Sequence, residues 1–168
     1  MDTSSQQDVK ALPPDFRSFS SPAGAYVLEL RGPRGWRPPQ AQAELFSARP
    51  GARRSVWTKP LPHRYGPAQA VVSDEGLVLL LDEGLRTPGP LAVAVLARDG
   101  SETARYSTSG IAKAAGVTLP ALIKSARVGI WMSAPPAMTP DGAAVVLEAA
   151  GVQLKVELHS GRLSRSRK

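Results

Sequence analysis

The chain has 168 residues and a formal net charge of +7, with 42% apolar residues, 21% charged residues and no cysteine. This length suffices for one domain with a sizeable core, and the lack of cysteine excludes disulfides, thiolate metal sites and thiol nucleophiles. No stretch approaches the ~20 apolar residues of a membrane helix, and the N-terminus lacks the basic and apolar parts of a signal peptide. We expect a cytoplasmic protein, or an exported one whose signal has been removed.

Residues 1–13 are polar and predict a loose N-terminal segment, whereas residues 14–163 predict a single β-rich repeat domain. The first repeat spans about residues 14–60. Its four expected strands are Phe16–Ser20, Ala25–Leu30, Ala41–Ser47 and Arg53–Lys59, with a Pro/Gly-rich loop at Arg31–Gln40 between the second and the third. Apolar and β-favouring residue types concentrate in these runs, and turn residues separate them.

The second repeat spans about residues 67–107. Its expected strands are Ala68–Val72, Leu77–Asp82, Leu91–Ala97 and Thr103–Tyr106. The runs Leu77–Leu81 and Leu91–Leu96 are continuously apolar, which indicates strands covered on both faces. Asp74-Glu75 and Asp82-Glu83 bracket one of these strands, and acids at strand ends are expected to serve turns and solvation.

A short helical insertion is predicted at about residues 108–126. Thr118 is a suitable N-cap, and Leu119, Leu122, Ile123 and Ala126 fall on one helical face. The third repeat spans about residues 128–163. It is expected to start with Val128–Met132, continue through Ala143–Glu148 and Val152–Leu158, and place its last strand after Gly161, before a basic tail at residues 164–168.

Each repeat contains the same phrase, a polar turn that ends in glycine before an apolar run. The copies are Ser21-Pro22-Ala23-Gly24, Ser73-Asp74-Glu75-Gly76 and Thr139-Pro140-Asp141-Gly142, and a second turn follows each, at Arg49-Pro50-Gly51, Arg98-Asp99-Gly100 and His159-Ser160-Gly161. Asp or Pro opens such turns and glycine adopts the positive φ that closes them. The pattern therefore predicts two hairpins per repeat, in three repeats.

This arrangement resembles the blade unit of β-propellers of the TolB and WD-repeat kind, as found in bacterial proteins built from such blades. Thr139-Pro140-Asp141-Gly142 is the best match, and the Trp-Asp signature of WD repeats is absent. The resemblance implies an all-β fold of three propeller-blade-like antiparallel sheets. Propellers close with about four to eight blades, so either a homo-oligomer completes a ring or the sheets form an open stack.

We find no catalytic constellation in the sequence. His63 and His159 are the only histidines, there is no Gly-x-Ser-x-Gly elbow, and the two acidic pairs lie at strand ends instead of facing each other across a cleft. No His-x-x-x-His pair or Asp-rich calcium loop is present. The sequence therefore predicts a non-enzymatic protein without a cofactor or a metal site.

The candidate binding residues lie in a basic segment with interleaved aromatics. Residues 31–64 hold eight basic side chains against Glu44 alone. Arginine offers bidentate donors and stacks on rings, so this composition suits an acidic protein surface or a phosphate backbone. The residues we single out are Arg34, Trp36, Arg37, Arg53, Arg54, Arg64 and Tyr65.

Our leading hypothesis is a protein-binding or scaffolding module that contacts an acidic protein partner through loops at one end of the blades. One alternative is a nucleic-acid-binding protein that uses segment 31–64 and the C-terminal tail. A second alternative is a hydrolase-type enzyme, which would require an oligomer that closes the ring. Fold alone does not choose among these.

Overall fold

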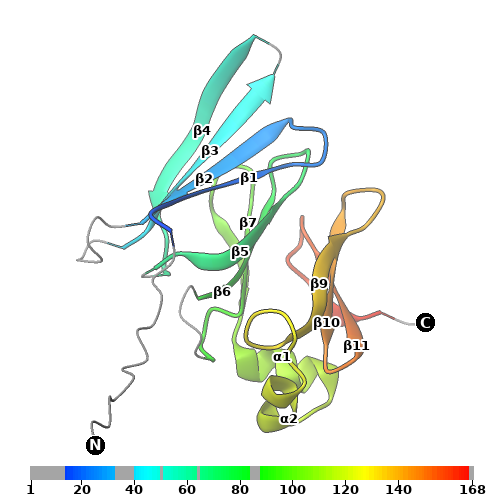
Figure 1. The fold of residues 1–168 in the computed structure, drawn as a ribbon. Helices are drawn as coiled ribbons and strands as arrows, with labels where there is room; N and C mark the ends of the chain where they lie inside the picture. Colours follow the sequence, from blue (N-terminus) through cyan, green and yellow to red (C-terminus); the bar gives the residue numbers. More distant parts are fainter. Residues whose placement is uncertain (1–13, 33–39, 50, 64, 84–87, 167–168) are drawn as a thin grey trace, which may run out of the picture.

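The computed structural model describes residues 14–32, 40–49, 51–63, 65–83 and 88–166, and all structural statements refer to these ranges. The described strands form three four-stranded antiparallel sheets that follow one another along the chain (Figure 1). Two short helices lie between the second and the third sheet. The predicted all-β class, with three blade-like sheets and a helical insertion, is therefore confirmed.

The first sheet has the order β1-β2-β3-β4 and places its apolar side chains on one face. Its strands are β1 (Phe16–Ser20), β2 (Tyr26–Arg31), β3 (Gln42–Arg49) and β4 (Ala52–Pro60). Leu28 pairs with Leu45, and Leu45 pairs with Trp57, so these three side chains point the same way, toward the second sheet. Successive side chains alternate between faces, and the opposite face of this sheet is largely polar.

The second sheet lies between the other two and has the order β5-β6-β7-β8 (Figure 1). Its strands are β5 (Pro67–Val72), β6 (Val78–Glu83), β7 (Val93–Leu96) and β8 (Glu102–Tyr106). Val78 and Leu80 pack in the apolar cluster shared with the first sheet, whereas Leu79 and Leu81 pack in the cluster shared with the third. Both faces of this central strand are thus covered by apolar neighbours, as its continuous apolar run predicts.

The third sheet has the order β12-β11-β10-β9. Its strands are β9 (Met132–Met138), β10 (Ala144–Ala149), β11 (Val152–Glu157) and β12 (Leu163–Arg165). The expected first strand at Val128–Met132 is wrong, because the chain turns there: Gly129 has φ +61°, and Val128 pairs with Met132 in an isolated bridge. The strand begins only at Met132 and runs through Pro135 and Pro136.

The helical insertion covers the apolar cluster between the second and third sheets at one end. Helix α1 (Thr108–Ala115) begins at the N-cap Ser107 and ends at Gly116, which has φ +72°. Helix α2 (Leu119–Lys124) begins at Thr118, whose side chain accepts a hydrogen bond from the Ala121 amide, as predicted. Ile111 and Leu122 are fully buried in the cluster. No helix in the described ranges is long and apolar enough to span a membrane.

The turn glycines of the repeats also allow neighbouring sheets to approach closely. A Cβ at Gly76 would lie 3.0 Å from Cε1 of Tyr26, and one at Gly100 would lie 3.0 Å from the Trp57 ring. A Cβ at Gly161 would lie only 2.4 Å from Cβ of Ala104. All three positions have φ between +70° and +85°. Glycine is therefore required twice over, for the turn conformation and for the close approach of the neighbouring sheet.

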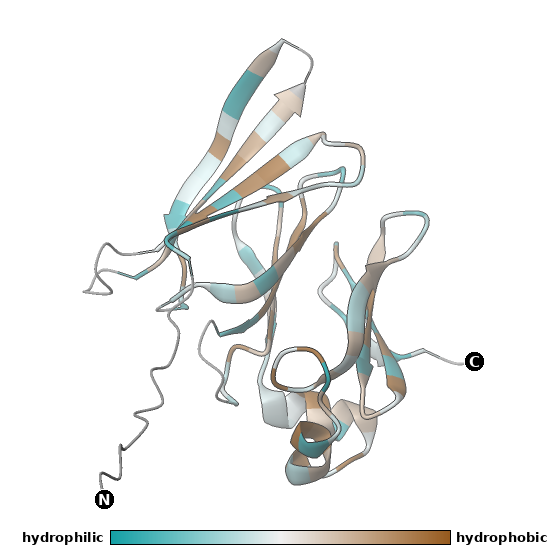
Figure 2. Cartoon of the chain, viewed as in Figure 1, coloured by the Kyte–Doolittle hydropathy of each residue, from teal (hydrophilic) through white to brown (hydrophobic). Residues whose placement is uncertain are grey.

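The outward face of the first sheet carries ion pairs, whereas its inner face carries Leu and Trp side chains. Glu29 is 8% exposed and lies between Arg31 and Arg53, which both pair with its carboxylate. Arg53 also stacks on Phe46, with 3.8 Å from Cζ to the ring centroid. Strand β2 is largely hydrophobic and β4 mostly hydrophilic in Figure 2. A polar outer face is typical of a terminal unit in a stack of repeats.

Candidate functional site: a cleft at the turn end of the blades

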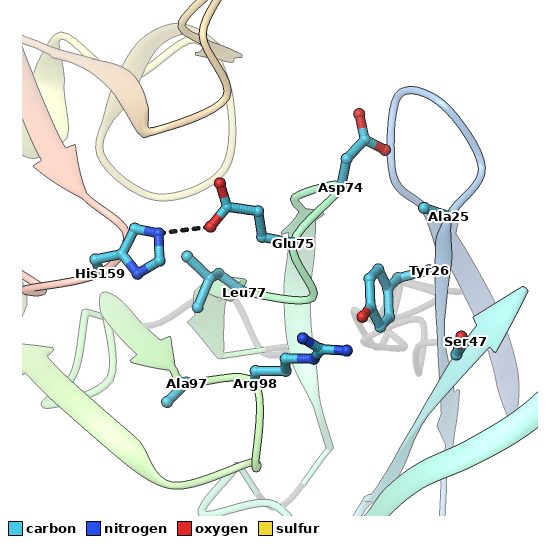
Figure 3. Close-up of a pocket in the computed structure, with 9 residues that line it drawn as sticks. All are labelled: Ala25, Tyr26, Ser47, Asp74, Glu75, Leu77, Ala97, Arg98 and His159. Atoms are coloured by element: carbon cyan, nitrogen blue, oxygen red, sulfur yellow. Dashed lines mark hydrogen bonds and ion pairs between the residues drawn. The ribbon is translucent and has the colours of Figure 1, made fainter. Parts of the chain in front are cut away.

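A cleft lies where turns of all three sheets meet, and it has a volume of about 560 Å³. The first sheet contributes Ala25, Tyr26 and Ser47; the second contributes Asp74, Glu75, Leu77, Ala97 and Arg98; and the third contributes His159 (Figure 3). Antiparallel hairpins place the β1–β2, β5–β6, β7–β8 and β11–β12 turns at the same end of the blades. The volume lies in the range of ordinary ligand pockets.

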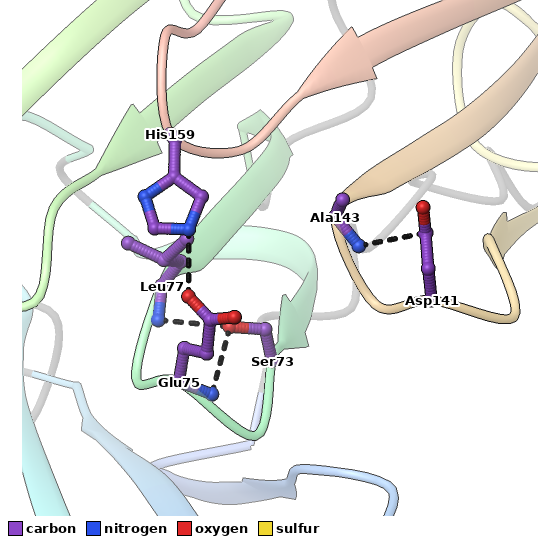
Figure 4. Close-up of polar contacts among 6 residues, drawn as sticks. All are labelled: Ser73, Glu75, Leu77, Asp141, Ala143 and His159. Atoms are coloured by element: carbon purple, nitrogen blue, oxygen red, sulfur yellow. Dashed lines mark hydrogen bonds and ion pairs between the residues drawn. The ribbon is translucent and has the colours of Figure 1, made fainter.

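The turn between β5 and β6 holds the acidic residues of the cleft in place. The Ser73 hydroxyl accepts hydrogen bonds from the Leu77 amide at 3.0 Å and the Glu75 amide at 3.3 Å (Figure 4). The corresponding turn of the third sheet uses Asp141, which accepts from the Ala143 amide at 3.0 Å. Such hydrogen bonds between side chains and backbone amides stabilise a turn, whose backbone lacks the regular hydrogen bonds of a sheet.

The acidic residues on one wall of the cleft, Asp74 and Glu75, already have partners in the neighbouring sheets. The Ala23 amide of the first sheet donates to Asp74 at 2.9 Å. Nε2 of His159, from the third sheet, lies 2.6 Å from the Glu75 carboxylate (Figures 3 and 4). The two residues therefore link the central turn to both neighbouring sheets, across the mouth of the cleft.

The opposite wall combines a fixed aromatic ring with a guanidinium group. Tyr26 is 6% exposed and packs against Gly76, so its ring cannot shift toward the central turn. Cζ of Arg98 lies 5.7 Å from the centroid of this ring, within the range of a cation–π contact. Arg98 makes no ion pair with a described carboxylate, and its neighbour Asp99 instead accepts from the amide and hydroxyl of Ser101.

The predicted binding residues do not form one described site. Arg34, Trp36, Arg37 and Arg64 lie outside the described residues. Arg53 and Arg54 are exposed near the start of β4, and Arg53 is paired with Glu29. Tyr65 is half-buried in the connection before β5, beyond the other end of that nine-residue strand. Lys59, also in the basic segment, donates to the Gly100 carbonyl at 2.7 Å and so joins the first two sheets.

Sequence reasoning missed the residues that line the cleft. Arg98 and His159 stand at the first position of the second turn in their repeats, a correspondence visible in the sequence. The signal that could have found them is that equivalent turns of a blade repeat lie at the same end. The charged residues of those turns are therefore neighbours, although 61 positions separate Arg98 from His159 along the chain.

Asp82 does not serve solvation, contrary to the expectation for an acid at a strand end. It is 2% exposed, has φ +58°, and accepts from Nε1 of Trp131 at 2.6 Å and from the Ile130 amide at 3.4 Å. Burial raises the pKa of this carboxyl to about 6, although the two hydrogen bonds act in the opposite direction. Asp82 therefore holds the turn that precedes β9 against the second sheet.

His63 lies in the connection between β4 and β5 and is buried. It is 0% exposed, and neither ring nitrogen has a partner with normal hydrogen-bond geometry in the described part of the chain. Burial, with Arg105 nearby, lowers the pKa of this imidazole to about 4. Within the described residues, no cluster of three or more His, Asp or Glu side chains could hold a metal ion.

Comparison with known proteins finds similarity to solved structures. A solved structure described as oligogalacturonate lyase in complex with manganese superimposes with a TM-score of 0.47 at 11% sequence identity, and the match covers 92% of this chain and 42% of that one. This chain thus spans less than half the length of that protein. No family model matches the sequence, and no curated protein matches it.

Proposed function

We propose that this chain is a non-enzymatic protein-binding module that contacts an acidic protein partner through the turn end of its blades. The observation that carries the proposal is the cleft to which all three sheets contribute side chains. Its rim is charged, and Ala25, Leu77 and Ala97 supply apolar surface inside it. Polar groups around an apolar centre are the usual composition of a protein-binding surface.

The contacts of the basic segment favour a protein partner over nucleic acid. Arg31 and Arg53 share the Glu29 carboxylate, and Lys59 is bound to the Gly100 carbonyl. Among the described residues of segment 31–64, these contacts leave fewer free positive charges for phosphates than the sequence count suggests. Affinity for a nucleic-acid backbone rises with the number of phosphates neutralised.

The hydrolase-type alternative receives less support from the cleft. Among the described residues, Nε2 of His159 contacts Glu75 and no serine hydroxyl is bonded to that ring. A nucleophile and its base need to be within hydrogen-bond reach of each other. A ring closed through the outer face of the first sheet would also have to desolvate the charges of Glu29, Arg31 and Arg53.

The proposal is tested by affinity isolation of the tagged chain from lysate of its source cells, with and without nuclease. We expect one protein to be recovered in both arms and lost when Arg98→Glu replaces the positive side chain of the cleft with a negative one. Arg127→Glu is the matched control, because Arg127 is an exposed arginine in the connection before β9 and does not line the cleft. Recovery that disappears with nuclease supports the nucleic-acid alternative instead.

A second pair of variants tests the basic loop predicted from the sequence. Arg34→Glu with Arg37→Glu reverses the charge of these two positions and changes none of the described residues that line the cleft. If these two substitutions abolish recovery of the partner and Arg98→Glu does not, the partner binds through segment 31–64, and the cleft is not its site.

A further inference from the structure

We infer that the cleft contains a carboxylate subsite, in which Arg98 binds an acidic side chain of a peptide segment. This inference rests on the proposed function and names the chemistry of its site. Four described arginines are paired with a carboxylate of the chain: Arg31 and Arg53 with Glu29, Arg105 with Glu102, and Arg162 with Glu157. Arg98 lines the cleft and lies against the ring of Tyr26, with no carboxylate partner among the described residues.

The contact with Tyr26 prepares Arg98 for bidentate binding. A guanidinium that lies against an aromatic face keeps the N–H groups of its edge free, and these match the two oxygens of a carboxylate. Tyr26 itself is fixed by Gly76, whose position leaves no room for a Cβ beside the ring. Less side-chain freedom is therefore lost when a ligand binds, which is the general advantage of a preorganised site.

The remaining charges of the cleft restrict the kind of anion that fits. Asp74 and Glu75 stand on the other wall, and in Figure 3 the Glu75 carboxylate points toward His159, away from Arg98. A chain of phosphates passing through the cleft would approach both carboxylates, and like charges brought together this way are unfavourable. A single carboxylate on Arg98, with neutral or basic neighbours next to Asp74 and Glu75, avoids that repulsion.

The size and the other lining residues agree with a peptide segment as the ligand. The cleft holds about 560 Å³, and Ser47 adds a hydroxyl on the first-sheet side. Ala25, Leu77 and Ala97 offer apolar contact to the methylene groups of a glutamate or of its neighbours. The subsite thus recognises one acidic residue in a mixed sequence and not a run of acids.

The test is a titration of the ¹⁵N-labelled chain with N-acetylglutamate N-methylamide, followed through the side-chain Nε–H signal of Arg98. We expect that signal and the backbone amides of Tyr26 and Ser47 to shift together. Arg98→Gln should weaken this binding by roughly tenfold, since hydrogen bonds to charged groups contribute about 1.5–3 kcal/mol. Arg127→Gln, at an exposed arginine that does not line the cleft, should leave it unchanged.

Two further titrations can overturn the inference. N-acetylglutamine N-methylamide has the same size without the charge, and inorganic phosphate has the charge without the carboxylate geometry. Equal shifts with the glutamine compound, or tighter binding of phosphate than of the glutamate compound, would exclude a carboxylate subsite. A partner that is still recovered by Arg98→Gln would refute the subsite and leave the protein-binding proposal intact, so the two failures are distinguishable.

Discussion

Two buried titratable residues give this protein opposite dependences of stability on pH. The pKa of Asp82 is raised from 3.8 to about 6, mainly by burial. The stability contributed by its neutral form is therefore present below pH 4 and lost as the pH rises through 6. The pKa of His63 is lowered from 6.5 to about 4, again by burial, so stability is instead lost as the pH falls from 6.5 toward 4. In the parent chain these two effects offset each other.

Asp82→Asn is expected to stabilise the protein at neutral pH. The amide oxygen still accepts from Trp131, asparagine tolerates the positive φ at this position, and the cost of burying a charge disappears. The gain in free energy of unfolding should approach about 3 kcal/mol at pH 7 and vanish near pH 4, since each pKa unit corresponds to about 1.4 kcal/mol. Thermal unfolding between pH 4 and 7 measures this. A variant that is less stable than the parent at pH 7 would contradict the assigned role of Asp82.

His63→Leu is expected to remove the loss of stability in acid. Neither ring nitrogen has a partner with normal hydrogen-bond geometry among the described residues, so an apolar side chain of similar size gives up no well-formed hydrogen bond. At pH 5 the variant should exceed the parent by about 2 kcal/mol beyond any difference at pH 7. Denaturant unfolding at the two pH values gives the comparison, and an unchanged difference between them would show that His63 is not buried in its neutral form.

At the scale of elements, hydrogen bonds between sheets and close contacts at the turn glycines hold the sheets together. Tyr106, on β8, donates to the Gly161 carbonyl at 2.6 Å and accepts from the Leu163 amide at 3.2 Å. At the start of β1, Arg17 donates to the Ala68 carbonyl of the second sheet at 3.1 Å. Because the turn glycines allow the closest approaches, packing between sheets should depend on them more than on any exposed ion pair.

Gly161→Ala is expected to destabilise the protein more than Gly24→Ala does. Both glycines have positive φ, +70° and +72°, so the conformational cost is shared. The added Cβ meets open space at Gly24 and lies 2.4 Å from the Ala104 side chain at Gly161. Overpacking of this kind costs about 1–3 kcal/mol. Equal losses in the free energy of unfolding for the two variants would mean that the Gly161 contact does not hold the second and third sheets together.

The strands and helices were more predictable than the site, because secondary structure depends on residues close together in the sequence and the site depends on residues far apart in it. Strands β1 to β8 and both helices follow from local patterns, such as the apolar run Leu77–Leu81 and the N-cap Thr118. The Asp82–Trp131 bond joins residues 49 positions apart, so no local pattern marks it. It also accounts for the wrong first strand of the third repeat, since Trp131 is turned toward Asp82 before β9 begins.

The cleft was unpredictable for a related reason. Its composition depends on which turns lie next to one another, and the charge count along the sequence pointed to segment 31–64 instead. In the structure, part of that charge is used within the first sheet and at its contact with the second, through Glu29 and the Gly100 carbonyl. Net charge in a segment therefore overstates the charge available to a partner.

At the scale of the whole molecule, the second sheet joins the other two into one unit. Strand β6 sends alternate side chains into two apolar clusters, one on each side. Neither outer sheet has a second apolar neighbour among the described residues, and the outer face of the first sheet is polar. The described fold is therefore a stack whose stability depends on its centre, as expected for repeats that share their cores with their neighbours.

Leu79→Ala and Leu80→Ala should cost similar amounts, although their side chains point to opposite sheets. Both are 0% exposed, and a buried Leu→Ala change costs about 2–5 kcal/mol. Trp57 lies in the first sheet and Trp131 lies beside the third. If the stack unfolds as one unit, the signals of these two residues should change from native to unfolded values at the same denaturant concentration in each variant. Separate transitions would show that the two clusters unfold independently.

The most direct test of the proposed function is photo-crosslinking in the source cells. A photo-reactive amino acid is placed at Ser47 inside the cleft and, in a second chain, at the exposed Lys113 of α1, beyond the other end of the blades. Crosslinks from Ser47 to a single protein, absent from Lys113 and reduced by Arg98→Glu, are the predicted result. Crosslinks that form only from Lys113 would contradict a partner bound at the turn end of the blades. Crosslinks from Ser47 that persist unchanged with Arg98→Glu would show that the partner binds there without Arg98.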